Sequence, residues 1–327
     1  MSDKIKRIAV FTSGGDAPGM NAALRAVVRY ATYKDLHVYG IYRGYEGMID
    51  GDIRRLETRD VGNIIHRGGT VLRTARSDRF RTKEGRQQAY ESLMASDIDA
   101  CVAIGGDGTF TGANVFSKEY DIPFIGIPGT IDNDLYGTDN TIGFDTAVNT
   151  AIEAVDKIRD TADSHNRLFF IEVMGRNSGF IALNTGIGSG SSNILIPERE
   201  TDIDALVKIL KSSSKRKKLF SLAIVAEGNK LGGATKIAEM VKEKCDFYDI
   251  KVAIIGHLQR GGSPTAADRV LASRLGCSAV EALLDGKKNL MVGVVNNVIK
   301  YTPFSKAIKA TKDPREDLIH MAEVLGI

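Results

Sequence analysis

Short apolar runs, each followed by a glycine-rich break and a helical stretch, recur along the 327-residue chain. The runs are four to seven residues long, rich in Val and Ile, and lack alternation with polar residues. This pattern is typical of parallel strands that are buried on both faces. The unequal intervals between the units argue against a solenoid repeat. The chain is therefore predicted to form open α/β sheets with helices on both faces. The five units lie at 8–21, 100–113, 169–180, 221–233 and 252–264.

Two helices can be predicted in more detail. Apolar residues at helical spacing over 23–31 predict the first helix, with Pro18 at its first position and Asp16 as a possible cap. The same spacing predicts a second helix over 145–160. The glycine-rich breaks follow the predicted strands, and open α/β sheets bind ligands at the carboxyl ends of their strands. Functional residues are therefore expected in these loops.

Composition narrows the range of functions. The length predicts about two domains, at roughly 150 residues each, and the net charge of +3 does not favour a nucleic acid as partner. No apolar run approaches the ~18 residues of a membrane span, and the N-terminus lacks an apolar stretch typical of a signal peptide. A cytoplasmic protein with no membrane partner is expected. Cys101, Cys245 and Cys277 fit neither a disulfide framework nor a zinc site, which predicts buried, reduced thiols.

The first two glycine-rich breaks suggest phosphate binding. SGGDAPGMN (13–21) lies between a predicted strand and a predicted helix, where backbone N–H groups and the helix dipole favour an anion, although a structural turn explains it as well. GGDGT (105–109) precedes a helical stretch predicted to begin near Phe110. Asp107 in this loop can bind Mg²⁺ that bridges to phosphates, or bond to its own backbone in a turn. No GxxxxGK[ST] sequence is present, so a P-loop is excluded.

A third loop carries paired carboxylates. PGTIDND (128–134) follows another short apolar run and contains Asp132 and Asp134. Two nearby carboxylates can place a proton acceptor beside a metal–phosphate centre, and a sugar hydroxyl needs such a base to become a good nucleophile. Asp132 can equally act as a capping or turn residue, so both interpretations stay open on this evidence alone.

Taken together, the motifs resemble those of the phosphofructokinase family in order and spacing, from residue 8 to about residue 275. They are SGGDAPGMNAALR (13–25), GGDGT (105–109), PGTIDND (128–134), SHNR (164–167), EVMGRNSG (172–179) and GHLQRGGSP (256–264). The resemblance implies two similar Rossmann-like α/β domains of three layers with mostly parallel sheets, and an active site in the cleft between them. It implies an ATP-binding domain of 1–142 plus 258–308 and a fructose 6-phosphate domain of 143–257 plus 309–327.

The resemblance also implies the activity and its residues. The chain would transfer the γ-phosphoryl group of ATP to the 1-hydroxyl of fructose 6-phosphate with Mg²⁺. The ATP-binding residues would be Gly15, Arg76, Arg81, Gly106, Asp107, Gly108 and Thr109, with Asp107 on the metal and Arg76 stabilising charge on the transferred group. Asp132 would be the catalytic base, assisted by Thr130, Asp134 and Arg176. The remaining substrate-binding residues would be Arg167, Met174, Gly175, Glu227, Lys251, His257 and Arg260.

Two positions bear on the phosphoryl donor, and one on the sugar phosphate. Pyrophosphate-dependent relatives carry an acidic residue at position 108 and a lysine at position 129, whereas this chain has Gly108 and Gly129, which favours ATP. The family usually has Arg at position 251. Lys251 keeps the charge but loses the two-pronged grip on phosphate, so a softer contact is predicted.

The resemblance further implies self-association and an effector. In the family, Arg167 and the position of Lys251 reach the substrate of a neighbouring subunit, typically in a homotetramer. Cationic positions match those that hold ADP or phosphoenolpyruvate: Arg25, Arg29, Arg159, Arg216 and Lys218. Ser192 replaces a common acidic residue and Thr58 a common arginine, so an anionic effector with blunted ADP activation is predicted.

Three other functions compete with this one. A pyrophosphate-dependent phosphofructokinase would be distinguished by positions 108 and 129. NAD kinases and lipid kinases share the GGDG sequence, but PGTIDND and GHLQRGG have no role there. A sensor that binds sugar phosphate or nucleotide without turnover is disfavoured because Asp107 and Asp132 are both present. The two RGG sequences, at 67–69 and 260–262, are more typical of turns than of an RNA-binding tract.

Overall fold

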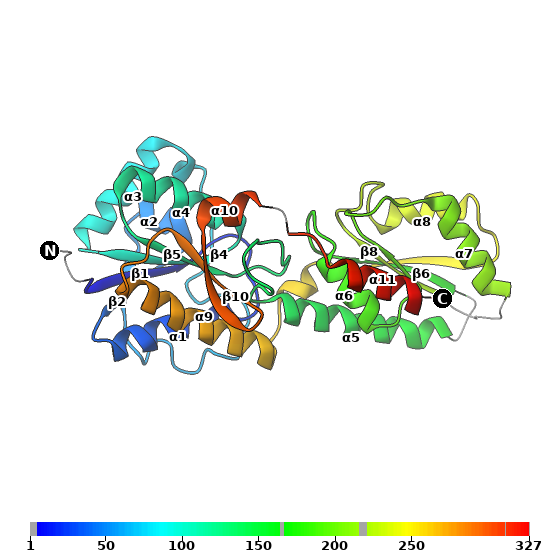
Figure 1. The fold of residues 1–327 in the computed structure, drawn as a ribbon, viewed down its shortest axis with the longest axis horizontal. Helices are drawn as coiled ribbons and strands as arrows, with labels where there is room; N and C mark the ends of the chain where they lie inside the picture. Colours follow the sequence, from blue (N-terminus) through cyan, green and yellow to red (C-terminus); the bar gives the residue numbers. More distant parts are fainter. Residues whose placement is uncertain (1–4, 164–166, 216–220, 311, 327) are drawn as a thin grey trace. The chain divides into compact units, whose positions relative to one another are not determined.

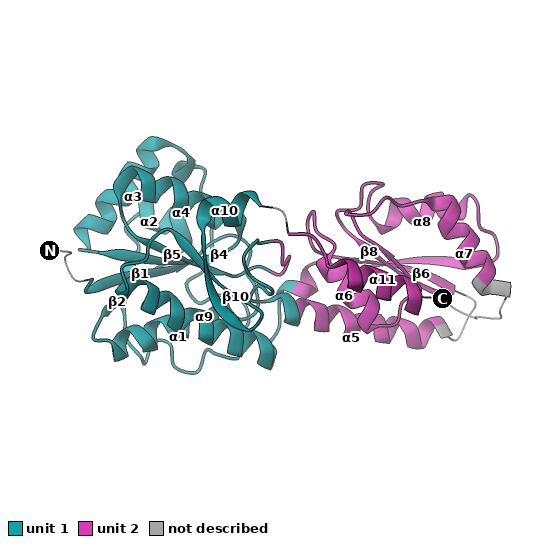
Figure 2. Ribbon diagram, viewed as in Figure 1, with its two compact units in different colours: residues 1–130, 135–146, 260–311 teal, residues 131–134, 147–259, 312–327 magenta. Residues whose placement is uncertain are grey.

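The structure is a computed structural model that describes residues 5–163, 167–215, 221–310 and 312–326. The chain forms two compact units (Figure 2). Unit 1 comprises Met1–Thr130, Leu135–Thr146 and Arg260–Thr311; unit 2 comprises Ile131–Asp134, Ala147–Gln259 and Lys312–Ile327. The assignment of ATP to one domain and the sugar to the other, with a cleft between them, stays a prediction.

Unit 1 is built on a sheet that has seven strands within the described residues, in the order β11-β10-β5-β4-β1-β2-β3. The inner strands run parallel, and the two edge strands, β3 and β11, run antiparallel to their neighbours. The strands are β1 (Arg7–Thr12), β2 (His37–Ile41), β3 (Ile53–Leu56), β4 (Ala100–Gly105), β5 (Phe124–Pro128), β10 (Leu290–Val295) and β11 (Val298–Pro303).

Helices cover both faces of this sheet (Figure 1). One face carries α1 (Met20–Tyr33) and α9 (Ala266–Leu284), which pack closely enough that a Cβ on Gly276 would lie 2.6 Å from the Cβ of Ala26. The other face carries α2 (Gly44–Ile49), α3 (Lys83–Ala95), α4 (Asp107–Tyr120) and α10 (Phe304–Lys309), with the short 3₁₀ helix η1 (Arg79–Arg81) nearby. The central strands β1 and β4 are buried on both faces, which explains their unbroken apolar runs.

Unit 2 has a smaller, all-parallel sheet of four strands among the described residues, in the order β7-β8-β6-β9. Its strands are β6 (Arg167–Val173), β7 (Asn193–Leu195), β8 (Ser221–Ala226) and β9 (Asp249–Ile254). The helices α7 (Ile203–Lys215) and α8 (Ala234–Lys242) pack on one face, and α5 (Phe144–Asp163), α6 (Phe180–Gly188) and α11 (Glu316–Leu325) lie on the other (Figure 1). The 3₁₀ helix η2 (Gly256–Arg260) follows β9.

The predicted fold class is confirmed, because both units are α/β layers on mostly parallel sheets. The apolar runs of the five glycine-containing units form β1, β4, β6, β8 and β9, and the predicted helix over 145–160 is α5. In the described part of the chain, no helix combines the length and the apolar character needed to cross a membrane. All three cysteines are free thiols, but Cys277 is only partly buried, contrary to the prediction for it.

Two predicted helix starts are wrong. The helix α1 begins at Met20, after Pro18 and Asp16, because Gly19 has a left-handed φ of 105° that the helix cannot include. The helix α4 begins at Asp107 and not near Phe110. Gly106 is extended and stands at the N-cap, so Asp107 lies in the first helical turn, where the helix dipole favours an acidic side chain.

Candidate active site

Three glycine-containing loops meet at the carboxyl edge of the unit 1 sheet. Ser13, which follows β1, donates its backbone N–H to the carbonyl of Ile104 at 3.0 Å, and its own carbonyl accepts from Oγ1 of Thr109 at 3.1 Å. A Cβ on Gly106 would lie 3.5 Å from the Cβ of Thr130, in the loop after β5. The structure therefore brings together the predicted residues Gly106, Thr109 and Thr130.

The glycines of this edge differ in the space around them. A Cβ on Gly105 would lie 2.5 Å from the carbonyl oxygen of Ser13, and one on Gly129 would lie 3.2 Å from the side chains of Ile104 and Met20. In contrast, a Cβ on Gly108 would meet no described atom within 4 Å. Packing alone thus requires a small residue at 105 and restricts 129, whereas position 108 is open.

Asp107 has the features of a cation ligand. Its Oδ1 atom is buried, yet it accepts no hydrogen bond from any described residue. A buried carboxylate oxygen without a donor is costly, and a bound cation removes that cost. The described residues hold no cluster of three or more His, Cys, Asp or Glu suited to a metal. A single carboxylate fits Mg²⁺, which commonly takes one or two carboxylates and completes its shell with phosphate oxygens and water.

The structure places Arg260 directly beside Gly15. Its Nη1 atom donates to the carbonyl of Asp16 at 3.2 Å, and a Cβ on Gly15 would lie 2.5 Å from the same Nη1 atom. Sequence reasoning assigned Gly15 to ATP and Arg260 to the sugar phosphate. Gly15 and Arg260 therefore lie side by side at the carboxyl end of β1.

The segment that carries Arg76 and Arg81 starts from the same edge. The hydroxyl of Thr12, the last residue of β1, donates to the carbonyl of Arg73 at 3.0 Å and fixes the start of the segment. Arg76 is exposed and forms no hydrogen bond or ion pair with any residue of the described ranges. Arg81 ends η1 and is also exposed, while its carbonyl accepts from Nη1 of Arg86 at 2.8 Å.

Tyr45 supports this edge, and sequence reasoning missed it. Its hydroxyl donates to the carbonyl of Thr109 at 2.5 Å, and its ring lies against Gly112, where a Cβ would approach to 2.9 Å. Burial raises the pKa of the Tyr45 phenol well above its usual value, so it remains a neutral donor. No local signal marks Tyr45, because its partner lies 64 positions away.

In unit 2, the loop with Asp132 is buried and held from several sides. Asp132 is 4% exposed, and its carbonyl accepts from the hydroxyl of Ser178 at 2.8 Å. Between the two acids, Asn133 has a left-handed φ of 53° and accepts a hydrogen bond from Nζ of Lys312 at 2.9 Å. Asp134 is partly buried. The tail of the chain, which lacks diagnostic motifs, thus contributes Lys312 to this loop.

Glu227 organises the neighbouring loop after β6. Its Oε1 atom accepts from the backbone N–H of Gly175 at 3.1 Å and of Arg176 at 2.7 Å. Arg176 has a left-handed φ of 52°, an uncommon conformation for a residue with a side chain. The buried amide of Gln259 adds a second support, because its Oε1 accepts from the N–H of Met174 at 2.9 Å. The predicted residues Met174, Gly175, Arg176 and Glu227 therefore lie together.

The predicted phosphate ligands Arg167 and Lys251 share one acidic partner. Asp249 lies 3.0 Å from Nζ of Lys251 and 3.4 Å from Nε of Arg167. The hydrogen bond from Lys251, with a further contribution from Arg167, holds the pKa of Asp249 below its usual value. His257 is exposed on η2. Arg167 and Lys251 thus lie close enough together to face one anion.

The predicted effector residues are spread over both units. On α1 of unit 1, Arg25 is half-buried and Arg29 is exposed. In unit 2, Arg159 on α5 donates to the carbonyl of Ser189, and its Nε lies 3.9 Å from Asp156. Ser192 is partly buried. The predictions for Arg216 and Lys218 lie outside the described residues.

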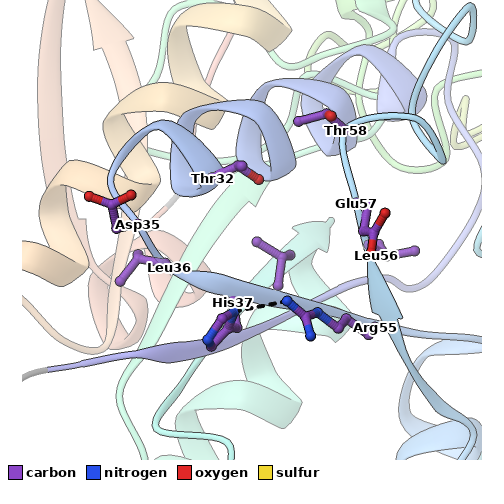
Figure 3. Close-up of a pocket in the computed structure, with 9 residues that line it drawn as sticks. Thr32, Asp35, Leu36, His37, Arg55, Leu56, Glu57 and Thr58 are labelled. Carbon is purple, nitrogen blue, oxygen red and sulfur yellow. Dashed lines mark hydrogen bonds between the residues drawn. The ribbon is translucent and has the colours of Figure 1, made fainter.

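Thr58 lines a cavity of about 470 Å³ in unit 1 (Figure 3). His37, at the start of β2, accepts a hydrogen bond at Nδ1 from Nη2 of Arg55 at 3.2 Å, and both residues line this cavity. Because β1 and β2 are parallel and His37 pairs with Arg7, the cavity opens at the amino edge of the sheet. It is therefore separate from the glycine loops, which follow the carboxyl ends of the strands.

Comparisons with known proteins agree with this architecture. The phosphofructokinase family model matches residues 7–283. The chain is 55% identical to ATP-dependent 6-phosphofructokinase 2 of Bacteroides thetaiotaomicron, over 99% of each chain. Phosphofructokinase from Saccharomyces cerevisiae has a TM-score of 0.88 at 39% identity; the match covers 93% of this chain but 45% of the yeast chain. Pyrophosphate-dependent phosphofructokinase from Marinobacter aquaeolei has a TM-score of 0.83 at 27% identity, over 95% and 86% of the two chains.

The fold defines an α/β protein of two units, each built on a mostly parallel sheet. The chain belongs to the phosphofructokinase family.

Proposed function

We propose that this chain is an ATP-dependent 6-phosphofructokinase, which transfers the γ-phosphoryl group of ATP to the 1-hydroxyl of fructose 6-phosphate. Its relative from Bacteroides thetaiotaomicron, 55% identical over 99% of both chains, bears that name. The structural observation that carries the proposal is Asp107, whose buried Oδ1 lacks a hydrogen-bond donor among the described residues. It stands in the first turn of α4, at the edge where three glycine loops meet.

The ATP phosphates are assigned to unit 1. Backbone N–H groups of Gly15 and of residues 106–109 face phosphate oxygens, and the N-terminus of α4 adds a favourable dipole. Asp107 holds Mg²⁺, which neutralises charge on the phosphate oxygens when it is bound. Arg76 and Arg81, both exposed and extending from this edge, hold the nucleotide, and Arg76 stabilises charge that develops on the transferred group.

The proton transfer is assigned to Asp132. Its carboxylate accepts the proton of the 1-hydroxyl as general base, with Thr130 and Asp134 assisting. Arg176 contributes positive charge near the acceptor, and Glu227 fixes the backbone that carries Arg176. Met174 and Gly175 shape the sugar pocket, and Glu227 can also accept hydrogen bonds from sugar hydroxyls.

The 6-phosphate of the sugar is assigned to Arg167, Lys251, His257 and Arg260. The shared contact of Arg167 and Lys251 with Asp249 keeps these two cations together. Lys251 provides a single rotating ammonium where an arginine provides a planar fork, so its contact with phosphate is the softer of the two.

The choice of ATP over pyrophosphate rests on position 108. Because a side chain at Gly108 would meet no described atom within 4 Å, glycine there is not required by packing. The open space suits the α-phosphate side of a nucleotide. Gly129 is weaker evidence, since packing against Ile104 and Met20 already restricts it.

Assembly and regulation complete the proposal. A homotetramer lets Arg167 and Lys251 reach the substrate of a neighbouring subunit, which couples substrate affinity to the interface. An anionic effector, ADP or phosphoenolpyruvate, binds near Arg25, Arg29 and Arg159. The enzyme acts in the cytoplasm, where its substrates are found.

A coupled assay with ATP, Mg²⁺ and fructose 6-phosphate tests the proposal. The expected result is formation of ADP and fructose 1,6-bisphosphate, with Asp132→Asn lowering kcat by roughly 10²–10⁴-fold. Turnover with pyrophosphate and none with ATP would show the donor to be wrong. Phosphorylation of NAD or a lipid, without sugar turnover, would contradict the proposed function itself.

A further inference from the structure

Two identical tripeptides, Arg67–Gly69 and Arg260–Gly262, pack backbone against backbone in unit 1. A Cβ on Gly68 would lie 2.2 Å from the carbonyl oxygen of Gly262 and 3.3 Å from its backbone nitrogen. No side chain fits at that distance, so glycine at 68 is required by the contact. The two loops, nearly 200 positions apart in the sequence, therefore pack directly against each other.

Arg269, in the first turns of α9, clamps the second loop with a two-pronged contact. Its Nε atom donates to the carbonyl of Pro264 at 2.8 Å, and its Nη2 atom donates to the hydroxyl of Ser263 at 2.9 Å. The same hydroxyl donates onward to the carbonyl of His66 at 2.8 Å. A continuous chain of hydrogen bonds thus runs from α9 through the second loop to the first.

Asn21, on α1, holds the first loop from the other side. It is 1% exposed, and its Nδ2 atom donates to the carbonyls of Arg67 at 3.0 Å and Gly68 at 3.2 Å. Its Oδ1 atom accepts from the N–H of Val71 at 2.8 Å. The helices α1 and α9 pack closely together. Asn21 on α1 and Arg269 on α9 therefore hold the paired loops from two adjacent helices.

The second loop begins with Arg260, a residue that the proposed function needs. Its Nη1 atom lies 3.2 Å from the carbonyl of Asp16, above Gly15. Arg269 holds Ser263 and Pro264, which follow Arg260 by three and four positions in the same loop. The guanidinium of Arg269 itself bonds to a backbone carbonyl and a hydroxyl group of the loop. Such contacts can fix the position of the loop and of Arg260 within it.

We infer that Arg269 is a positioning residue for recognition of the sugar 6-phosphate, and that it acts by setting the place of Arg260. The inference rests on the proposed function. Position 269 requires an arginine, because the single ammonium of a lysine cannot hold the Pro264 carbonyl and the Ser263 hydroxyl in the same planar geometry.

Arg269→Lys tests the inference against a matched control, Arg274→Lys. Arg274 lies on the same helix and also makes a two-pronged contact, with Nη1 at 2.8 Å from Oδ1 and Nη2 at 2.9 Å from the carbonyl of Asn297, on the β10–β11 turn. Arg269→Lys should raise KM for fructose 6-phosphate about three- to tenfold, the cost of one weakened hydrogen bond or two. Its kcat and its KM for ATP should stay within about twofold, and the control should change none of the three.

A double-mutant cycle separates positioning from general loosening. In an Arg260→Ala background, Arg269→Lys should cause no further loss of kcat/KM for fructose 6-phosphate, because the residue it positions is gone. A loss of equal size in both backgrounds would overturn the inference. So would an unchanged KM in the single variant.

Hydrogen exchange supplies a readout that needs no turnover. Amides of residues 66–69 and 260–264 should both exchange faster in Arg269→Lys, and also in Ser263→Ala, than in the wild type. Exchange unchanged in the 66–69 loop would overturn the link between the loops. If the wild type fails to phosphorylate fructose 6-phosphate, the proposed function fails, while the exchange result still decides whether Arg269 positions the loops.

Discussion

The carboxyl edges of the two sheets are held together in different ways. In unit 1, backbone groups and glycines dominate: Ser13 bonds to Ile104 and Thr109, and Gly105 has no room for a side chain. In unit 2, carboxylates hold the loops. Glu227 binds the N–H groups of residues 175 and 176, and Glu172 binds that of Ala234 at 2.7 Å.

The two edges should therefore be sensitive to different kinds of substitution. Unit 1 is held by backbone contacts at close range, so the size of a side chain decides what it tolerates. Unit 2 sets its loops by charge-assisted hydrogen bonds, which are roughly twice as strong as neutral ones, so the chemistry of a side chain decides. Size-changing substitutions at Gly105 should therefore act on unit 1, and charge-removing substitutions at Glu227 should act on unit 2.

The largest effect is expected from a single methyl group in unit 1. Gly105→Ala places a Cβ 2.5 Å from the Ser13 carbonyl, so it should lower the free energy of unfolding by ~1–3 kcal/mol. Gly108→Ala, three residues on, enters open space in a helix and should leave stability unchanged or raise it by up to ~1 kcal/mol. Urea unfolding measures both. Equal destabilisation of the two variants would contradict the role given to size.

In unit 2, a substitution that removes a charge and keeps the size of the side chain should lower activity. Glu227→Gln keeps an acceptor for the N–H groups of Gly175 and Arg176 but removes its charge. We expect kcat/KM for fructose 6-phosphate to fall about tenfold, with little change in the KM for ATP. Steady-state kinetics with each substrate varied in turn measures this.

Glu172→Gln is the matched control, since Glu172 makes the same kind of contact on β6 with the N-terminus of α8. It should cost stability without changing the KM for the sugar. If both variants lose activity equally, the charge at 227 has no particular role in the sugar site.

The smallest effect concerns an ion pair between α3 and α4. Arg86 contacts Glu119 through Nε at 2.6 Å and Nη2 at 2.8 Å, and this hydrogen bonding lowers the pKa of Glu119 from its usual 4.5. A lowered pKa stabilises the folded state above the unfolded pKa, and that contribution is lost as pH falls through the folded pKa.

Glu119→Gln should therefore lower stability by about 1 kcal/mol at pH 7. The difference from the wild type should be complete above the unfolded pKa of 4.5, and it should shrink as the pH falls through the lowered folded pKa of Glu119. Thermal unfolding of both proteins, measured at several pH values from about pH 3.5 to about pH 7, tests this prediction. A difference that stays constant with pH would mean that packing, and not charge, explains the loss.

Local patterns were sufficient to predict most of the fold. The Val- and Ile-rich runs of β1, β4 and β8 are buried parallel strands, as expected. The run in β9 is not, because β9 is an edge strand of the unit 2 sheet and its Ile254 is 60% exposed. The hairpin of β10 and β11 was missed, although Asn296 and Asn297 between two β-branched runs are a recognised signal for such a turn. The start of α4 was misplaced because glycines at 106 and 108 suggest a loop more strongly than a helix.

The candidate site was less predictable, for a physical reason. Motifs identify residues that touch a ligand, because their chemistry is tied to it. The residues that hold those motifs in place carry no such signal. Tyr45 bonds to a residue 64 positions away, and Asn21 bonds to one 46 positions away. Arg269 bonds to the loop that precedes its own helix. Only folding brings these partners together.

Asp107 is proposed above to hold the metal that accompanies the ATP phosphates. The most direct measurement is the Mg²⁺ concentration that gives half-maximal activity in Asp107→Asn, with Glu84→Gln as control for an acidic residue in the first turn of another helix. We expect Asp107→Asn to raise this concentration at least about tenfold, and the control to leave it unchanged. An unchanged Mg²⁺ requirement in an active Asp107→Asn variant would contradict the claim.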